Sequence, residues 1–230
     1  MITMPMTSIE ECLARKFFEL GAVKIDIIRG FKLKLHEENP DAPLSPLFFN
    51  LRAHNHPKQG LLNAEVITKI GWGLYNMAAT QLRYDCVCGV PLAGEPFARA
   101  FANVSVPWRR PLVIKLKKEV LPNGERRVTG PWTGTDNIFS DAKVLLIDDL
   151  ITGAHSKLEA IRALELAGAK VQDVLVIVDR EQGGSKQLEE AGFNVYYMFT
   201  ISQLIEFYFK EGMISENQYG AIRYYIRANR

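Results

Sequence analysis

The chain carries at positions 144–156 the stretch Val144-Leu145-Leu146-Ile147-Asp148-Asp149-Leu150-Ile151-Thr152-Gly153-Ala154-His155-Ser156, and a helical pattern follows at 157–167. The apolar residues that begin this stretch are typical of a strand buried on both faces of a parallel sheet. Such a strand delivers two adjacent carboxylates at its carboxyl edge, where open α/β sheets bind their ligands. The stretch therefore predicts a strand, a ligand-binding turn and a helix.

Three further runs have the same buried-strand character, and stretches with helical or loop patterns separate them. Strands that alternate with helices predict βαβ units with right-handed crossovers. We therefore expect an α/β fold with a mostly parallel central sheet flanked by helices. The runs are Tyr84–Val90, Leu112–Ile114 and Val174–Val178.

The N-terminal part precedes this pattern and has a different character. Apolar residues at helical spacing predict a helix at 9–20, with Ser8 as its cap. The stretch 24–35 alternates loosely, which predicts a pair of strands broken at Gly30. An extended segment is expected at 47–51.

Helical spacing recurs in the middle and at the end of the chain. It predicts a helix at 63–82, and 91–102 has the pattern of a loop followed by a helix. The C-terminal part, 186–230, has the pattern of a helix, a strand at 195–199 and two amphipathic helices split near Gly212. We expect the two chain ends to cooperate in covering the sheet.

Composition limits the class of protein. A chain of 230 residues with 47% apolar residues can bury one sizeable core, so we expect a single domain with an appendage. Lys and Arg together number 28 against 26 acidic residues, which gives no global field for nucleic acid or a membrane surface. Cys12, Cys86 and Cys88 fit neither a zinc site nor a C-x-x-C motif, and no apolar run has the roughly 20 residues of a membrane span. The N-terminus has no secretory pattern, so we expect a cytoplasmic protein.

The turn that follows Asp148 and Asp149 has the composition of a phosphate-binding site. Backbone N–H groups of the small residues 152–156, with the positive end of the following helix, form a cradle for a monophosphate. Asp148 and Asp149 would repel a bare phosphate, whereas the hydroxyls of a ribose 5-phosphate can donate to them. Alternatively, the two acids only cap and solvate the turn, and Ser156 with Glu159 resembles a capping box.

The segment Asp148–Ser156 resembles the signature of type I phosphoribosyltransferases: two acids, two apolar residues, a threonine, then small residues ending in serine or threonine. The segment 178–184, Val-Asp-Arg-Glu-Gln-Gly-Gly, resembles the orotate phosphoribosyltransferase family in particular. Softer resemblances are Phe31–Lys34, Ser45–Asn50 and the loop Cys88–Gly94, in which Gly94 permits close backbone approach. The resemblance covers approximately residues 17–207.

The resemblance implies an Mg²⁺-dependent transfer of phosphoribosyl from 5-phosphoribosyl 1-diphosphate to orotate, which forms orotidine 5′-monophosphate and pyrophosphate. It also implies a homodimer and a hood over the base, built from residues 1–60, beside a core at 61–185 and C-terminal elements at 186–230. Mg²⁺ would be held through substrate oxygens, with no direct protein ligand. The implied catalytic residues are Lys117, Lys118, Asp148 and Asp149.

The implied binding residues form two groups. The diphosphate would contact Asp148, Asp149, Leu150, Ile151, Thr152, Gly153, Ala154, His155, Ser156, Lys117 and Lys118. Orotate would contact Lys34, Phe48, Phe49, Thr152 and Arg180. A guanidinium suits the orotate carboxylate or imide edge because it donates two parallel hydrogen bonds. The alternative for Arg180 is a surface ion pair with Asp179 or Glu181.

The chain departs from the family in its catalytic loop, typically Arg-Lys-Glu-x-Lys-x-His-Gly. Leu121 replaces the second lysine and Asn123 the histidine, and we hypothesise that Arg126 or Arg127 supplies the missing charge. The loop also has the pattern of a plain hairpin, because Asn123-Gly124 favours a type I′ turn. Two alternatives follow: transfer to another nucleobase, or a catalytically silent regulatory protein that binds the diphosphate. His155 is also atypical and either donates to the phosphate or points to solvent.

Overall fold

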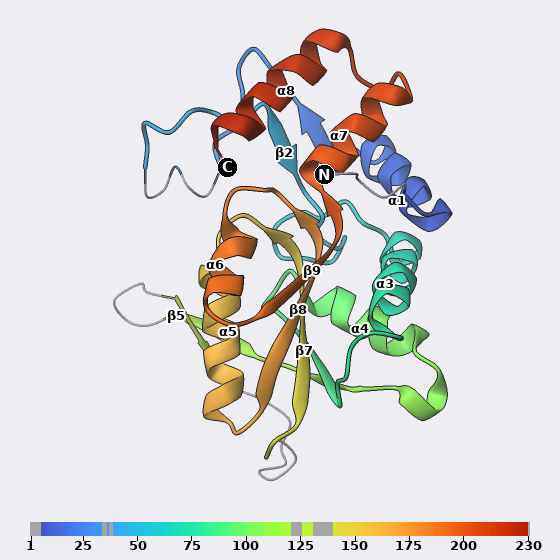
Figure 1. Ribbon diagram of the computed structural model, residues 1–230, viewed down its shortest axis with the longest axis vertical. Coiled ribbons are helices and arrows are strands. Elements are labelled where there is room, and N and C mark those ends of the chain that lie inside the picture. The colour runs from blue at the N-terminus through green and yellow to red at the C-terminus, as the bar shows by residue number, and fades with distance from the viewer. Residues whose placement is uncertain (1–5, 34–35, 37–38, 121–125, 131–139, 230) are drawn as a thin grey trace.

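The computed structural model describes residues 6–33, 36, 39–120, 126–130 and 140–229 (Figure 1). Its helices are α1 Ser8–Glu19, α3 Ala64–Ala78, α4 Glu95–Val104, α5 His155–Leu166, α6 Gly184–Glu190, α7 Ile201–Lys210 and α8 Glu216–Ala228, with a short 3₁₀ turn at Pro107–Arg109. Its strands are β1 Val23–Ile25, β2 Leu47–Phe49, β3 Cys86–Gly89, β4 Leu112–Ile114, β5 Lys117–Val120, β6 Arg126–Thr129, β7 Lys143–Ile151, β8 Lys170–Asp179 and β9 Asn194–Thr200.

The central sheet confirms the predicted α/β class. Its five strands run parallel in the order β4-β3-β7-β8-β9. The chain therefore winds outward from β3 to β4 in one direction and from β7 through β8 to β9 in the other. The reversal lies between β3 and β7, and ligands of open α/β sheets bind at the carboxyl ends of the strands beside such a reversal.

Helices cover both faces of this sheet (Figure 1). Helices α3 and α4 lie on one face and α5 and α6 on the other. The side chains of β7 alternate between them, because successive residues of a strand point to opposite faces. Leu145 and Ile147 join the cluster that includes α3 and α4, whereas Val144 and Leu146 join the cluster that includes α5.

The N-terminal and C-terminal segments come together beyond the carboxyl ends of the strands. The antiparallel pair β1–β2 lies there with α7 and α8 (Figure 1). The Tyr208 hydroxyl of α7 donates to the Ala14 carbonyl of α1 over 3.0 Å, and both residues are buried. The division into a hood at 1–60, a core at 61–185 and C-terminal elements at 186–230 stays a prediction.

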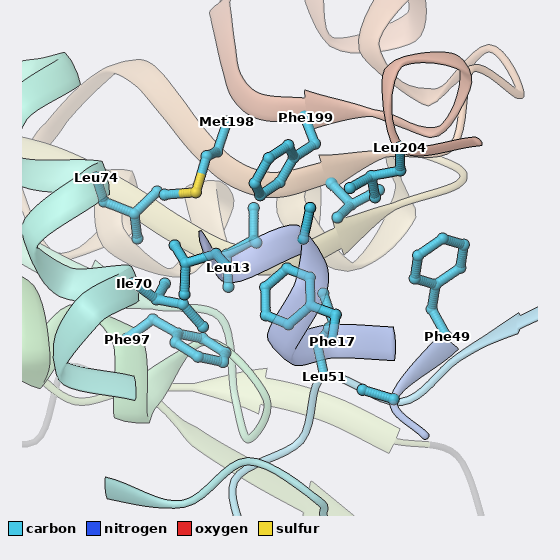
Figure 2. Packing of buried hydrophobic residues seen from close by; sticks show 14 of the residues in the cluster. Leu13, Phe17, Phe49, Leu51, Ile70, Leu74, Phe97, Met198, Phe199 and Leu204 are labelled. Atoms are coloured by element: carbon cyan, nitrogen blue, oxygen red, sulfur yellow. The ribbon is translucent and has the colours of Figure 1, made fainter. Parts of the chain in front are cut away.

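One large apolar cluster joins the N-terminal helix to the sheet (Figure 2). The rings of Phe17 and Phe199 meet edge to face with centroids 6.0 Å apart. Burial of such side chains stabilises the fold by about 1.5–3 kcal/mol each. The cluster draws on α1, β2, α3, α4, β9 and α7, through Leu13, Phe17, Phe49, Leu51, Ile70, Leu74, Phe97, Met198, Phe199 and Leu204.

Several local predictions are confirmed and others are wrong. The C-terminal helices do separate at Gly212, which has a φ of +66°. The cap of α1 is Thr7 instead of Ser8, because Thr7 forms a reciprocal capping box with Glu10. The strand pair expected at 24–35 is wrong for the described residues: β1 ends at Ile25, and beyond it Phe31 makes one isolated bridge to Ser45.

The predicted strand Leu112–Ile114 forms β4, but it is not buried on both faces. It pairs only with β3 in the sheet, and Leu112 is exposed. An edge strand keeps an apolar sequence here because Ile114 packs into the cluster with α5. Within the described part of the chain, no helix is long and apolar enough to cross a bilayer.

Candidate functional site

Strand β7 is longer than the apolar run that predicts it. It continues through Asp148 and Asp149 to Ile151, because β8 pairs along this whole length, with Ile151 opposite Asp179. On the other side β3 ends at Gly89, which pairs with Ile147. Both acids therefore lie in extended backbone just beyond the end of β3, at the reversal of strand order.

The two acids are successive residues of β7 with different surroundings, and a side-chain hydrogen bond links their carboxyl groups. Asp148 continues the α5-facing side of β7 and is only 3% exposed. One of its oxygens, Oδ2, lies 2.7 Å from Nζ of Lys157 on α5. The other, Oδ1, accepts from the Asp149 N–H over 3.0 Å. Both carboxylate oxygens of Asp148 are thus engaged inside the protein.

Asp149 is partly exposed. Its Oδ1 accepts from the Leu150 N–H over 2.8 Å. Burial of the carboxyl raises its pKa to about 7, and the negative charge of Asp148 adds to this effect, while Lys157 opposes it. Of the two acids, Asp149 is therefore the one placed to meet a ligand.

The loop after β7 leads directly into α5. This helix begins at His155 with Ala154 as its N-cap, and no side chain caps its first turn. The predicted capping box of Ser156 and Glu159 is therefore wrong, because the helix begins earlier than expected. Uncapped N–H groups at a helix N-terminus attract anions.

Residues within the loop have distinct surroundings. Gly153 is exposed, whereas Ala154 is buried with a φ of −82°, which an alanine adopts without strain. The Ala154 N–H donates over 3.0 Å to Oε1 of Gln187 on α6. The His155 side chain is 84% exposed, and its Nε2 lies 3.9 Å from Glu159. The imidazole thus points to solvent.

The Cys88–Gly94 segment reaches the same point from β3. The Val90 N–H donates to the Ile147 carbonyl over 2.9 Å, next to Asp148 in the chain. A Cβ on Gly94 would lie 2.3 Å from that carbonyl oxygen, so only glycine fits here. The close approach expected of Gly94 is thus made to the backbone of β7.

Arg180 follows β8 and is 5% exposed. Its N–H donates to the Ile151 carbonyl over 3.0 Å, which places its backbone beside the loop. Its Nη2 lies 3.4 Å from the Ser45 hydroxyl, and its Cζ lies 6.0 Å from the centre of the Phe49 ring. The motif at 178–184 thus meets the segment Ser45–Asn50.

The alternative for Arg180, an ion pair with Asp179 or Glu181, is not formed. Asp179 instead accepts from the Glu181 N–H and from the Ser185 hydroxyl, at 2.7 and 2.6 Å. Among the described residues, Arg180 has no salt bridge, and its buried Nε has no acceptor. Burial lowers its pKa to about 10, so the guanidinium stays charged at neutral pH.

The two aromatic residues of β2 face opposite ways. Phe49 is buried in the main apolar cluster and contacts Arg180. Phe48 is partly exposed, and its ring packs against Phe31 with centroids 5.8 Å apart. Phe49 therefore supports the guanidinium from within the core, whereas Phe48 belongs to the surface. Lys34 lies outside the described residues.

The described residues of the catalytic-loop segment form two antiparallel strands, β5 and β6, as a hairpin requires, while the type I′ turn expected at 123–124 stays a prediction. Strand β6 packs against α5. Lys117 pairs with Glu119 at 2.9 Å, and Lys118 is half-buried. Arg126 and Arg127 follow on β6, opposite Val120 and Glu119. Leu121 and Asn123 lie in 121–125, outside the described residues.

Three residues that contact the site are absent from the predicted set: Ser45, Lys157 and Gln187. The sequence did carry a signal for Lys157, because this residue lies on the apolar face of α5, three, four and seven positions before Ala160, Ile161 and Leu164. Gln187 and Ser45 contact residues 33 and 135 positions away. No local pattern predicts such partners.

The described residues contain no group of three or more His, Cys, Asp or Glu side chains that could hold a metal ion. Mg²⁺ keeps several waters and binds through one or two carboxylates plus substrate oxygens. The described residues offer no cage of their own, and such a donor set fits Mg²⁺ held through the oxygens of a substrate.

Comparison with known proteins finds relatives named orotate phosphoribosyltransferase and uridine 5′-monophosphate synthase. The orotate phosphoribosyltransferase of Sorangium cellulosum is 33% identical over 144 residues, which cover 62% of this chain and 73% of that protein. The uridine 5′-monophosphate synthase of Caenorhabditis elegans is 28% identical over 181 residues, 78% of this chain, and the chain spans 33% of its length.

Among solved structures, the UMP synthase of Leishmania donovani matches with a TM-score of 0.72 and 22% identity, covering 95% of this chain and 42% of that chain. No protein-family model matches. The likeness in structure shows the fold, and the bacterial relative shares one residue in three over most of its own length. The chain belongs to the orotate phosphoribosyltransferase family.

Proposed function

We propose that the protein transfers the phosphoribosyl group of 5-phosphoribosyl 1-diphosphate to orotate, which gives orotidine 5′-monophosphate and pyrophosphate. The observation that carries the proposal is the buried Arg180, whose charge has no carboxylate partner among the described residues. A buried cation without a partner is costly, so its retention argues for an anionic ligand.

The chemistry of orotate complements the groups left without partners. Two buried side-chain polar atoms in the described part of the chain lack a partner: Nε of Arg180, a donor, and Oε1 of Gln182, an acceptor. Orotate offers a carboxylate and carbonyl oxygens as acceptors and an imide N–H as a donor. Arg180 would bind the anionic or carbonyl edge, and Gln182 is available to the N–H.

The ribose and its phosphate would bind at the end of β7. Asp149 would accept from ribose hydroxyls, and the uncapped start of α5 with the loop 152–156 would hold the 5-phosphate. Lys117 and Lys118, on the hairpin beside α5, would meet the pyrophosphate. Arg127 is exposed on the same hairpin, and the hypothesis that Arg126 or Arg127 supplies the charge missing at Leu121 stays a prediction.

Catalysis would then rest on orientation and charge. A ring nitrogen of orotate attacks the anomeric carbon, and the bond from that carbon to the diphosphate oxygen breaks. The electron pair of that bond leaves with pyrophosphate, which also takes up the proton lost from the ring nitrogen. Asp149 stabilises positive charge on the ribose, and the lysines stabilise negative charge on the leaving group. Mg²⁺, when bound, screens the pyrophosphate oxygens.

The direct test is orotate consumption, followed spectrophotometrically with 5-phosphoribosyl 1-diphosphate and Mg²⁺. We expect magnesium-dependent loss of orotate with equimolar release of pyrophosphate. Release of pyrophosphate only with another nucleobase would replace orotate as the substrate. Tight binding of the diphosphate without turnover on any base would favour a silent regulatory protein.

The homodimer implied by the resemblance and the cytoplasmic location expected from the sequence stay predictions. Sedimentation of the purified chain at micromolar concentration would test the first.

A further inference from the structure

One lysine of α5 has its side chain buried inside the molecule. Lys157 is in the first turn of α5 and only 3% exposed. It occupies the buried face of the helix with Ala160, Ile161 and Leu164, where an apolar side chain would satisfy the packing. Burying an ammonium costs several kcal/mol unless the charge is paired and hydrogen-bonded.

The ammonium of Lys157 has two partners, and both belong to β7. Its Nζ lies 2.7 Å from Oδ2 of Asp148 and also donates to the Leu150 carbonyl. One contact fixes the first acid, and the other fixes the strand just before the loop 152–156. Lys157 therefore ties the start of α5 to the strand on which both acids lie.

This arrangement gives the two acids different surroundings. Asp148 is held on the α5 face with both oxygens engaged, whereas Asp149 is partly exposed and accepts from the Leu150 N–H through Oδ1. We propose that Lys157 is a positioning residue, which holds the Asp148 carboxylate on the α5 face and leaves Asp149 as the acid that meets the ribose hydroxyls. This inference rests on the proposed function.

The pKa of Asp149 depends on the charge of this lysine. The charged groups that act on it are Asp148 of β7 and Lys157 of α5, which have opposite effects on its pKa. On the neighbouring strand β8, Val176 lies opposite Asp148 and Val178 lies opposite Leu150, and both are apolar. Asp179 at the end of β8 is bonded to Ser185, and α4 carries Glu95 and Arg99.

The test is the titration of Asp149 in the free protein, followed by its carboxyl carbon in NMR, in the wild type and in Lys157→Met. Methionine fills similar space without charge. We expect the midpoint to rise by about one pH unit, since an opposite charge within ~4–6 Å commonly shifts a pKa by about 1–3 units. Lys157→Arg, which keeps the charge, is the matched control and is expected to stay near the wild-type midpoint.

Binding gives the second readout. Calorimetry measures the affinity for 5-phosphoribosyl 1-diphosphate with Mg²⁺ across pH 5.5–9. In Lys157→Met, the pH below which this affinity falls is expected to rise together with the Asp149 midpoint, so that binding at pH 7 is roughly tenfold weaker. If Lys157→Met does not fold, Asp148→Asn provides the opposite shift, because Lys157 then acts on Asp149 alone.

Unchanged Asp149 midpoints in both variants would overturn the inference and leave Lys157 a packing residue. A wild type that titrates as expected but binds no diphosphate would instead defeat the proposed function, and with it the part of the inference that concerns ribose. The two failures are thus distinguishable.

Discussion

Arg180→Met is predicted to stabilise the free protein while it destroys orotate binding. The substitution removes a buried charge that, among the described residues, has no salt-bridge partner. Methionine has a similar length and suits the apolar ring of Phe49 beneath it. Function alone would then explain why an arginine is kept at this position.

The magnitude follows from the surroundings of the guanidinium. Burial lowers the pKa of Arg180 from 12.5 to about 10, so burial opposes the charge by about 3 kcal/mol. Against this, the substitution loses a 3.4 Å hydrogen bond to Ser45, which is long and weak. We expect a net gain of about 1–3 kcal/mol in the free energy of unfolding, the usual penalty of an unsatisfied buried polar group.

The loss of affinity is expected to be larger. Removing one partner of a buried charge pair costs about 2–5 kcal/mol, which corresponds to approximately 30-fold to a few thousand-fold in the dissociation constant of orotate. Urea unfolding measures the first quantity, and calorimetry or the KM for orotate measures the second. Arg180→Lys is the matched control, because it keeps the charge but loses the paired N–H donors.

Two results would refute this reasoning. One is a fall of several kcal/mol in the stability of Arg180→Met, which would make the arginine a structural residue. The other is an unchanged KM for orotate, which would remove Arg180 from the base site. Either one defeats the assignment without reference to the diphosphate site.

Three other predictions concern different parts of the site. Burial raises the pKa of Asp149 to about 7, above its unfolded value of 3.8, so the folded protein binds this proton more tightly and its free energy of unfolding falls as pH rises from 4 to 7. Urea unfolding at pH 4.5 and 8 is expected to show this decline in the wild type and not in Asp149→Asn. An equal decline in both proteins would contradict the prediction. Lys118→Ala is expected to lower kcat for pyrophosphate release by about tenfold or more with little change in unfolding, and unaltered turnover would exclude the hairpin from catalysis. Gly94→Ala is expected to lower the free energy of unfolding by about 1–3 kcal/mol or more, because its Cβ would lie 2.3 Å from the Ile147 carbonyl oxygen. Gly220→Ala in α8 is the control: its Cβ meets no atom within 4 Å, and the free energy of unfolding is expected to rise by about 0.5–1 kcal/mol. Equal midpoints of the two variants in thermal unfolding would show that the backbone at Gly94 shifts to make room.

The sequence was most informative for elements whose buried face can be recognised from the spacing of apolar residues within the element itself. Continuous apolar runs predicted β3, β7 and β8, and helical spacing predicted α3, α7 and α8. These patterns work because a residue's neighbours along one strand or helix decide which face meets the core. The family resemblance likewise depended on short segments that stay intact along the chain, above all 148–156 and 178–184.

Boundaries were less predictable, because they depend on partners elsewhere in the chain. Strand β7 continues through its acids since β8 runs beside it as far as Asp179. The second strand expected near Phe31 shrinks to one bridge, since Ser45 is its only strand-like partner there among the described residues.

The sequence by itself determined the order of strands and helices, the turn that bears the acids and the family to which the chain belongs. Only the tertiary structure decided that Lys157 pairs with Asp148 and that Arg180 is buried against Ser45, which is 135 positions away. The physical reason is that periodicity records whether a side chain is buried, whereas the partner that meets it is chosen by packing between segments that are distant in the chain.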